Sequence, residues 1–229
     1  MAVKGENKCL KMNRATSIYK VDKSKKFVIK PKPGKHSKTS SVSVGYIIKD
    51  LLFLADNTRE LKYILKSRYL TVDKKIVSDH RLPVGLNDVL EIPKIKKYYK
   101  MSYALNGLLV PFEITKEETR YKICKIVSKK LINKNNVQLT TNDGRTIITS
   151  NLAYKPKASI KLDLEEGTIK EYYPLEENRE VLVIGGKHIG KKGKITKVST
   201  ATMLRPMLLK FKDKLEEYET TENNVIVIN

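Results

Sequence analysis

The segment that could most directly perform chemistry is a glycine-rich stretch at residues 185–192, GGKHIGKK. It follows the apolar run 181–184 and comes close to G-x-x-x-x-G-K-[ST], the loop that holds nucleotide phosphates between a strand and a helix. Lys192 stands where that motif needs a hydroxyl for Mg²⁺, and residues 195–198 alternate like a strand, so the required helix is missing. The spacing therefore favours a strand, a glycine-rich loop and a second strand over a nucleotide-binding site.

The basic side chains of this loop could bind phosphate simply as cations. Glycines allow the backbone turns that such a loop needs, and basic side chains then present donors to phosphate oxygens. The candidate residues are Lys187, His188, Lys191, Lys192 and Lys194. The alternative is a structural turn whose lysines face solvent.

The other reactive side chains show no catalytic or metal-binding spacing. The acidic pairs at 117–118 and 165–166 are expected to face solvent and not to form a general acid and base. Two cysteines and three histidines are scattered over 229 residues, which predicts neither a disulfide framework nor a zinc site. We therefore expect no catalytic residues, no metal and no cofactor.

The charge of the chain indicates an anionic partner. There are 46 Lys and Arg residues against 25 Asp and Glu residues, which gives a formal net charge of +21, and 40% of residues are apolar. Residues 1–38 alone hold 12 basic and 2 acidic residues, a net charge of +10. Such a concentration of charge favours nucleic-acid contact. No apolar run reaches membrane-spanning length and no secretory leader is visible, so the cytosol or nucleus is the expected compartment.

The first 38 residues are expected to form an extended basic arm. They are poor in apolar side chains and end in the run KPKPGKHSK at residues 30–38. Such a segment is disordered by itself and becomes ordered when its cations displace counterions from a polyphosphate. The expected contact residues are Lys8, Lys11, Arg14, Lys32, Lys35, His36 and Lys38. The alternative is a solubilising tail or a nuclear-import tract.

Two helices are expected after the arm. Residues 46–55 have apolar side chains at the spacing of one helical face. Asn57, followed three residues later by Glu60, has the character of a capping box that starts a second helix ending near residue 67. The basic residues on the outer side of the second helix are Arg59, Lys62 and Lys66. They would form either a binding stripe or an ordinary solvated face.

A hairpin and a further strand follow the helices. Residues 69–72 and 76–77 predict two short strands around a tight turn, and residues 89–92 predict a third strand. Lys74 stands where such a turn usually has glycine. A left-handed conformation there costs about 1 kcal/mol, so we expect the turn either to differ or to be anchored by contacts.

The rest of the chain reads mainly as strands. They are expected at residues 108–113, 121–127, 137–141, 146–149, 159–164, 207–211 and 225–228, with turns at 142–144 and 165–167. The predicted fold class is α+β, mostly β. The predicted parts are the arm 1–38, a helix-hairpin domain 39–97, a central β domain 98–177 and a final barrel 178–229.

Two segments resemble known RNA-binding modules. The order helix, helix, hairpin and strand, with LKSRYLTVDKKIV and VGLNDVLEI, resembles the small domain shared by ribosomal protein S4, pseudouridine synthases and some tRNA synthetases. REVLVIGGKHIGKKGKITKV resembles the KOW motif, which begins an SH3-like barrel. The RNA surface that the first resemblance implies consists of Arg59, Lys62, Lys66, Arg68, Lys74 and Lys75.

Nearly the whole chain resembles the eukaryotic and archaeal type of small-subunit ribosomal protein four. The resemblance includes PKPGKHS, EITKEETRYKICKI, TTNDGRTI, the long segment IKLDLEEGTIKEYYPLEENREVLVIGGKHIGKKGKI and the last strand ENNVIVIN. The residues that match the family motifs are Pro31, Pro33, Gly34, His36, Glu60, Lys62, Arg68, Gly186, Gly190 and Gly193.

This resemblance implies a structural constituent of the small, 40S-type ribosomal subunit that clamps small-subunit rRNA, contributes to translation and has no enzymatic role. The implied partners are small-subunit rRNA and other small-subunit ribosomal proteins, with no membrane and no small-molecule substrate. The implied location is the cytoplasmic ribosome, with assembly in the nucleolus if the source is eukaryotic. Two alternatives remain: a free RNA-binding translation or transcription factor, and the anchor domain of an RNA-modifying enzyme.

Overall fold

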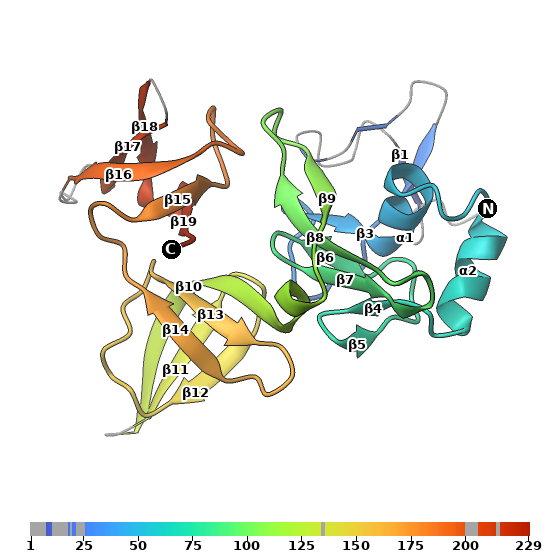
Figure 1. Ribbon diagram of the computed structural model, residues 1–229, viewed down its shortest axis with the longest axis horizontal. Helices are drawn as coiled ribbons and strands as arrows, with labels where there is room; N and C mark the ends of the chain where they lie inside the picture. The colour runs from blue at the N-terminus through green and yellow to red at the C-terminus, as the bar shows by residue number, and fades with distance from the viewer. Residues whose placement is uncertain are drawn as a thin grey trace. The chain divides into compact units, whose positions relative to one another are not determined.

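A computed structural model of the chain shows two compact units, Met1–Lys122 and Ile123–Asn229 (Figure 1). The structure describes residues 8–10, 18, 20–21, 26–133, 136–199, 206–213 and 216–229. Strands predominate and the helices are short, which confirms the predicted α+β, mostly β fold class. The predicted division into four parts stays a prediction, because contacts within the described chain separate it only after residue 122.

Unit 1 is built on an antiparallel sheet in the order β5-β4-β7-β8-β9. Its strands are β4 (Thr71–Val72), β5 (Lys75–Ile76), β7 (Val89–Ile92), β8 (Lys97–Tyr103) and β9 (Leu109–Glu113). β3 (Ser41–Ser43) and β6 (Pro83–Gly85) form a second, small sheet. Tyr99, Met101 and Tyr103 are buried at every second position of β8. This pattern makes β8 part of the core of unit 1, although its sequence was grouped with the central β domain above.

The first predicted helix begins and ends earlier than expected. It consists of α1 (Val44–Tyr46) and a π-helix, η2 (Ile47–Leu51), instead of residues 46–55. The side chain of Ser43 accepts a hydrogen bond from the N–H of Tyr46 (3.3 Å) and caps its start. Tyr46, Ile47 and Ile48 are all almost fully buried. Burying three consecutive side chains requires a wider apolar face than a regular amphipathic helix provides, which explains the departure from the predicted spacing.

The second helix, α2 (Thr58–Lys66), forms as predicted. Asn57 is its N-cap, and the Glu60 carboxylate accepts hydrogen bonds from the N–H groups of Asp56 (2.9 Å) and Asn57 (3.4 Å). Leu61 and Leu65 face the core and are buried. The capping box and the apolar spacing therefore suffice to define this helix.

The hairpin between β4 and β5 contains the strained turn that the sequence suggested. Asp73 (φ 50°) and Lys74 (φ 64°) both adopt the left-handed conformation, as in a type I′ turn. The Lys74 ammonium lies 2.7 Å from Oε1 of Glu91 and donates to Oγ1 of Thr119 (3.2 Å). These contacts anchor the turn and confirm the expectation of an anchored turn.

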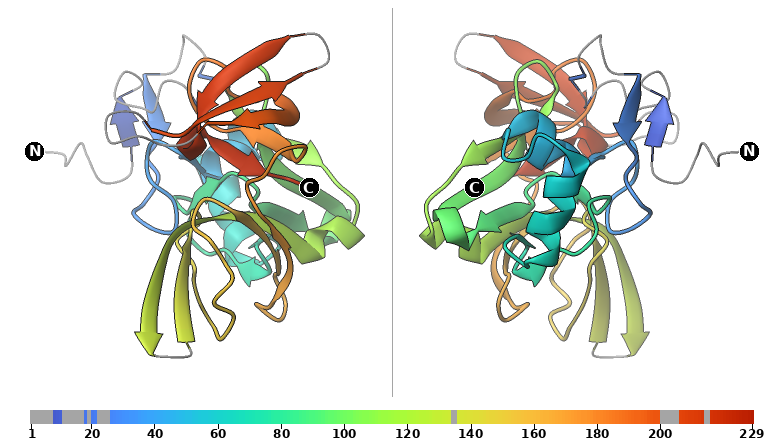
Figure 2. Two further views of the ribbon diagram at one scale, coloured as in Figure 1. Left: turned by 90° about the vertical axis from the view of Figure 1, so that its left-hand side faces the viewer. Right: turned by 90° about the vertical axis from the view of Figure 1, so that its right-hand side faces the viewer.

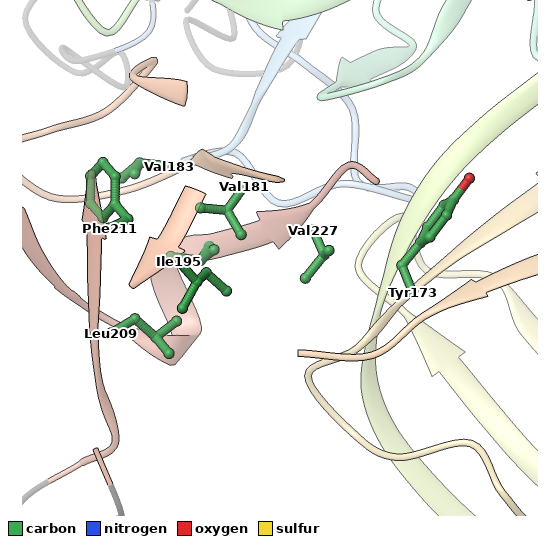
Figure 3. Packing of buried hydrophobic residues seen from close by; sticks show 8 residues of the cluster. Tyr173, Val181, Val183, Ile195, Leu209, Phe211 and Val227 are labelled. Carbon is green, nitrogen blue, oxygen red and sulfur yellow. The ribbon is translucent and has the colours of Figure 1, made fainter. Parts of the chain in front are cut away.

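Unit 2 contains two five-stranded antiparallel sheets, β12-β11-β10-β13-β14 and β18-β17-β16-β15-β19. The strands of the first sheet are β10 (Tyr121–Asn133), β11 (Asn136–Thr141), β12 (Thr146–Thr149), β13 (Ser159–Asp163) and β14 (Ile169–Tyr173). Those of the second are β15 (Glu180–Val183), β16 (Lys192–Val198), β17 (Leu208–Lys212), β18 (Glu217–Thr221) and β19 (Val225–Val227). The second sheet encloses an apolar core in which Val181, Ile195 and Leu209 point toward one another (Figure 3).

A buried lysine connects the two sheets of unit 2. Lys125 on β10 donates to the backbone carbonyls of Glu222 (2.6 Å), Asn223 (3.0 Å) and Val225 (2.7 Å), which immediately precede or begin β19. Burial and the nearby charge of Lys157 lower the pKa of Lys125 to about 8. The ammonium is therefore still charged at neutral pH, and it donates hydrogen bonds to three backbone carbonyls.

The anchored turn gives a stability prediction. Lys74→Gly and Lys74→Ala both remove the ammonium contacts, but only the alanine variant keeps a Cβ in the left-handed conformation. We therefore expect the glycine variant to be more stable than the alanine variant by about 1 kcal/mol. Urea unfolding followed by far-UV circular dichroism measures the difference. Equal stability of the two variants would contradict a left-handed turn in solution.

Candidate nucleic-acid interface

The clearest basic surface of unit 1 lies on α2. Arg59, Lys62 and Lys66 are all exposed, whereas Leu61 and Leu65 of the same helix are buried. The right-hand view of Figure 2 shows α2, in teal, with its outer side open. The three cations of the predicted stripe thus lie on one accessible helix face, within about two turns of each other.

The hairpin adds cations beside this stripe. Arg68 and Lys75 are exposed, and Arg68 adopts a left-handed conformation (φ 57°) just after the helix. Lys74 is only half-exposed and forms the ion pair with Glu91 described above. Arg68 and Lys75 are therefore open to an anion, while the charge of Lys74 is already compensated.

The predicted arm is in part a folded element of unit 1. β2 (Phe27–Ile29) pairs with β1 (Lys8–Leu10), Val28 is buried, and the N–H of Lys32 donates to the carbonyl of Arg81 (2.8 Å). This corrects the expectation of a wholly disordered arm, because backbone pairing and apolar burial order it without a polyanion. Lys32 and Lys38 are exposed. The side chain of Lys8 and the whole of Lys11 and Arg14 lie outside the described residues.

Lys35 and His36, by contrast, point into the unit. Nε2 of His36 lies 3.1 and 3.0 Å from the two carboxylate oxygens of Asp88, and its side chain is only 3% exposed. Because a carboxylate can only accept, this ring nitrogen carries the proton. The Lys35 ammonium lies 2.7 Å from Asp73 and 3.3 Å from Asp88. These two residues were expected to contact nucleic acid, but the structure gives them internal partners.

A fifth group completes this buried cluster of charges. The Lys122 ammonium lies 3.0 Å from Oδ2 of Asp73 and also contacts Oδ1 of Asp88, and all three side chains are at most 1% exposed. Backbone donors add two further hydrogen bonds: the N–H of Val89 donates to Oδ1 of Asp73 (3.0 Å), and the N–H of Gly85 donates to Oδ2 of Asp88 (3.0 Å). The buried charge cluster thus consists of Lys35, His36, Asp73, Asp88 and Lys122.

Electrostatics within the buried charge cluster strongly favour ionised Asp88. Burial by itself raises the pKa of this carboxyl group, but Lys122, the hydrogen bond from His36 and the charge of Lys35 outweigh burial and hold the pKa of Asp88 far below its ordinary value. Sterics support the same arrangement, because a Cβ at Gly85 would lie 2.5 Å from Nδ1 of His36. The site can therefore fix the position of the hairpin, with Asp88 as an anion.

The glycine-rich loop of unit 2 presents a second basic surface. Gly193 on β16 pairs with Val181 on β15, which confirms the predicted strand, loop and strand. Lys187, Lys192 and Lys194 are exposed. His188 and Lys191 instead pack on Tyr218, with ring centroids 4.6 Å apart for His188 and the Lys191 ammonium 3.7 Å from the ring centroid.

Glycine is required in this loop for two physical reasons. Gly186 (φ 84°) and Gly190 (φ 85°) adopt conformations that side chains disfavour. A Cβ at Gly193 would lie 2.5 Å from the carbonyl oxygen of Lys212, so the close approach of β16 and β17 excludes a side chain. These are the three glycines that carry the family resemblance in this segment.

Across the described chain, no three His, Cys, Asp or Glu side chains are grouped as metal ligands would be. In the same residues, no helix combines the length and the apolarity needed to cross a membrane. Neither Asp73, Asp88 nor Lys122 was singled out from the sequence, although together they fix the basic hairpin.

Comparisons with known proteins agree along most of the chain. Residues 95–169 match the family model described as Ribosomal family S4e. The chain is 35% identical to small ribosomal subunit protein eS4 of Nanoarchaeum equitans over 202 residues, covering 88% of this chain and 86% of that protein. It is 33% identical to protein eS4A of Schizosaccharomyces pombe, covering 99% of this chain and 87% of that protein. A crystal structure of the 30S ribosomal protein S4e from Thermoplasma acidophilum is similar, with a TM-score of 0.73, 31% identity and coverage of 82% of this chain and 95% of that one.

The buried charge cluster predicts a pH-dependent stability. Asp88→Asn removes the negative charge beside the buried Lys122, so we expect the free energy of unfolding at pH 7 to fall by about 3–5 kcal/mol. Because the pKa of Asp88 is lower in the folded state, its contribution is present above the unfolded pKa near 4 and decreases as the pH falls below that value. The difference in free energy of unfolding between wild type and Asp88→Asn should therefore be about 1 kcal/mol smaller at pH 3 than at pH 7.

Urea unfolding curves at both pH values measure this difference. The matched control is Glu117→Gln, which changes an exposed carboxylate in the same unit and should alter stability by less than about 0.5 kcal/mol. An Asp88→Asn variant as stable as this control would show that the cluster does not hold the unit together.

Proposed function

The chain belongs to the ribosomal S4e family, and on that premise we propose that it is a structural constituent of the small ribosomal subunit that binds small-subunit rRNA. The observation that carries this proposal is the 33–35% identity to proteins named small ribosomal subunit protein eS4 or eS4A, which covers 88–99% of the chain. Both the basic helix-hairpin surface and the glycine-rich loop lie within a chain matched almost end to end. The function is therefore attached to the whole chain and not to one module.

Binding proceeds through electrostatics. Each lysine or arginine that neutralises a phosphate releases condensed counterions, which makes affinity high at low salt and steeply salt-dependent. A-form RNA has a deep major groove that side chains cannot read, so an exposed basic helix recognises RNA mainly by its shape and backbone. The stripe on α2 with Arg59, Lys62 and Lys66 has this chemistry, and no reaction is catalysed.

Each unit contributes its own contact surface. In unit 1, Arg68, Lys75, Lys32 and Lys38 extend the contacts of α2. In unit 2, the exposed lysines of the glycine-rich loop are Lys187, Lys192 and Lys194. Two separate basic surfaces on one chain allow it to bind more than one rRNA segment. Binding of the second surface is then intramolecular, which raises the overall affinity.

Lys35 and His36 serve RNA binding indirectly. Their partners are Asp73 in the hairpin turn and Asp88, so they orient the hairpin that presents Arg68 and Lys75. In the arm, the proposed RNA contacts are Lys8, Lys11 and Arg14. The proposed RNA contacts that already have a partner within the protein are Lys74, His188 and Lys191. The proposed partners are small-subunit rRNA and other small-subunit proteins in cytoplasmic ribosomes, with nucleolar assembly if the source is eukaryotic.

Charge reversal on α2 tests the proposed surface. We expect the triple variant Arg59→Glu, Lys62→Glu, Lys66→Glu to bind small-subunit rRNA at least tenfold more weakly, with a salt slope shallower by up to about three. Filter binding over a range of salt concentrations measures both quantities. The matched control, Lys97→Glu, Lys116→Glu, Lys130→Glu, changes three exposed lysines outside the proposed surface and keeps the same net charge. Equal losses in both variants would show that only overall charge matters.

Sedimentation separates a resident ribosomal protein from a free factor. We expect the tagged full-length chain, expressed in a cell whose own S4e protein is depleted, to sediment with small subunits in stoichiometric amount after a high-salt wash. Quantitative mass spectrometry of gradient fractions measures the ratio. Release of the chain into the soluble fraction by salt would favour a free RNA-binding factor instead.

A further inference from the structure

An apolar hollow lies beside the basic stripe of α2. It has a volume of about 440 Å³ and is lined by Tyr63 and Ile64 of α2, Tyr69, Leu54, and by Lys94 and Ile95 of the 3₁₀-helix η3 (Pro93–Ile95). This size falls in the range of small-ligand sites. None of these residues except Lys94 is charged, so the hollow offers aromatic and aliphatic surface within a strongly basic protein.

The hollow continues into a second, more open one. That depression shares Leu54, Tyr63 and Ile64 with the first and adds Arg59, Asn57 and Glu60. Tyr63 therefore stands between an apolar floor on one side and a basic residue of the α2 stripe on the other. Its side chain is unusually open for a tyrosine, since the residue is 69% exposed.

The charges around the hollow are matched to an anion. The Lys94 ammonium lies 4.3 Å from the centroid of the Tyr69 ring, and Arg59 lines the adjoining depression. The one acidic residue that lines either part, Glu60, is already engaged, because its carboxylate accepts from the N–H groups of Asp56 and Asn57. An occupant thus meets flat aromatic surface together with two positive charges that form no ion pair with any acidic residue among those the structure describes.

Backbone strain occurs next to the hollow, at the residue before Leu54. Phe53, directly before Leu54, is 79% exposed and adopts a left-handed conformation (φ 52°). A bulky residue in this conformation costs free energy, and burial of its own side chain does not offset that cost. Strain of this kind is concentrated at binding sites, where it presents a side chain to a partner.

We propose that this hollow binds an unpaired nucleobase of the rRNA that α2 contacts. The base would lie against the rings of Tyr63 and Tyr69, and its flanking phosphates would meet Lys94 and Arg59. Unstacked bases of single-stranded RNA are typically bound by stacking on aromatic side chains or arginine planes. A protein segment would also suit the apolar floor. The positive charges of Lys94 and Arg59 favour RNA, because it carries one negative charge per nucleotide. The inference rests on the proposed function and names the part of the RNA that this surface takes.

The absence of tryptophan from the sequence permits a direct test. Tyr63→Trp places a single indole at the open side of the hollow, and a base stacked on it should quench its emission. We expect quenching when the full-length variant is titrated with a short oligouridylate or with small-subunit rRNA. A blunt RNA duplex and polyglutamate should give none, because neither offers a free base.

Filter binding of the same samples separates failure of the nucleobase site from failure of the proposed rRNA-binding function. If the variant retains rRNA with wild-type affinity and its emission does not change, the nucleobase site is refuted while the proposed function stands. If the chain fails to retain rRNA at all, the proposed function fails first. Quenching by RNA-free small-subunit proteins would assign the hollow to a protein partner and would overturn the proposal.

A substitution provides an independent measure. Tyr63→Ala should weaken oligouridylate binding by about fivefold or more and leave duplex binding unchanged. The matched control is Phe112→Ala, which removes a half-exposed aromatic side chain from β9 of the same unit and should change neither affinity. Equal losses for single-stranded and duplex RNA in Tyr63→Ala would contradict stacking, since they would indicate a general change of the surface.

Discussion

The geometry of unit 1 depends on one ammonium group buried between two carboxylates. Lys122 contacts both Asp73 and Asp88, and all three side chains are almost fully buried. Buried charges of this kind tolerate little displacement, because each loses its partner before it reaches water. The hairpin turn, the turn before β7 and the first residues of β10 are therefore held in one arrangement, and the exposed Lys75 directly follows the hairpin turn.

The lysines of this protein accordingly have two different roles. Those on α2, and Lys187, Lys192 and Lys194 near the glycine-rich loop, are exposed. Lys35, Lys122 and Lys125 are internal: the first two neutralise aspartates, and the third holds three backbone carbonyls. The net charge of +21 thus arises both from an exposed basic surface and from lysines of the interior. Affinity for a polyanion should follow the exposed group and not the total.

Local patterns in the sequence predicted what local physics determines. The capping box of Asn57 and Glu60, the hairpin turn at Lys74 and the strand, loop and strand around Gly186 were all visible before the structure. The buried charge cluster was not, because its members are up to 87 residues apart in the sequence, from Lys35 to Lys122. A signal for Lys122 did exist: it shares one strand face with Cys124 and Ile126, both fully buried. β18 was missed since its sequence, EYETT, lacks apolar alternation.

Lys122 and Lys125, three residues apart on β10, differ in when their partners become available during synthesis of the chain. Asp73 and Asp88 have already been synthesised when Lys122 emerges, so the first unit can close as soon as this strand begins. Lys125 must wait for the carbonyls of residues 222, 223 and 225, which lie 97 to 100 residues further along the chain. Until residues 222–225 have been synthesised, the nascent second unit therefore holds a cation without its final ligands.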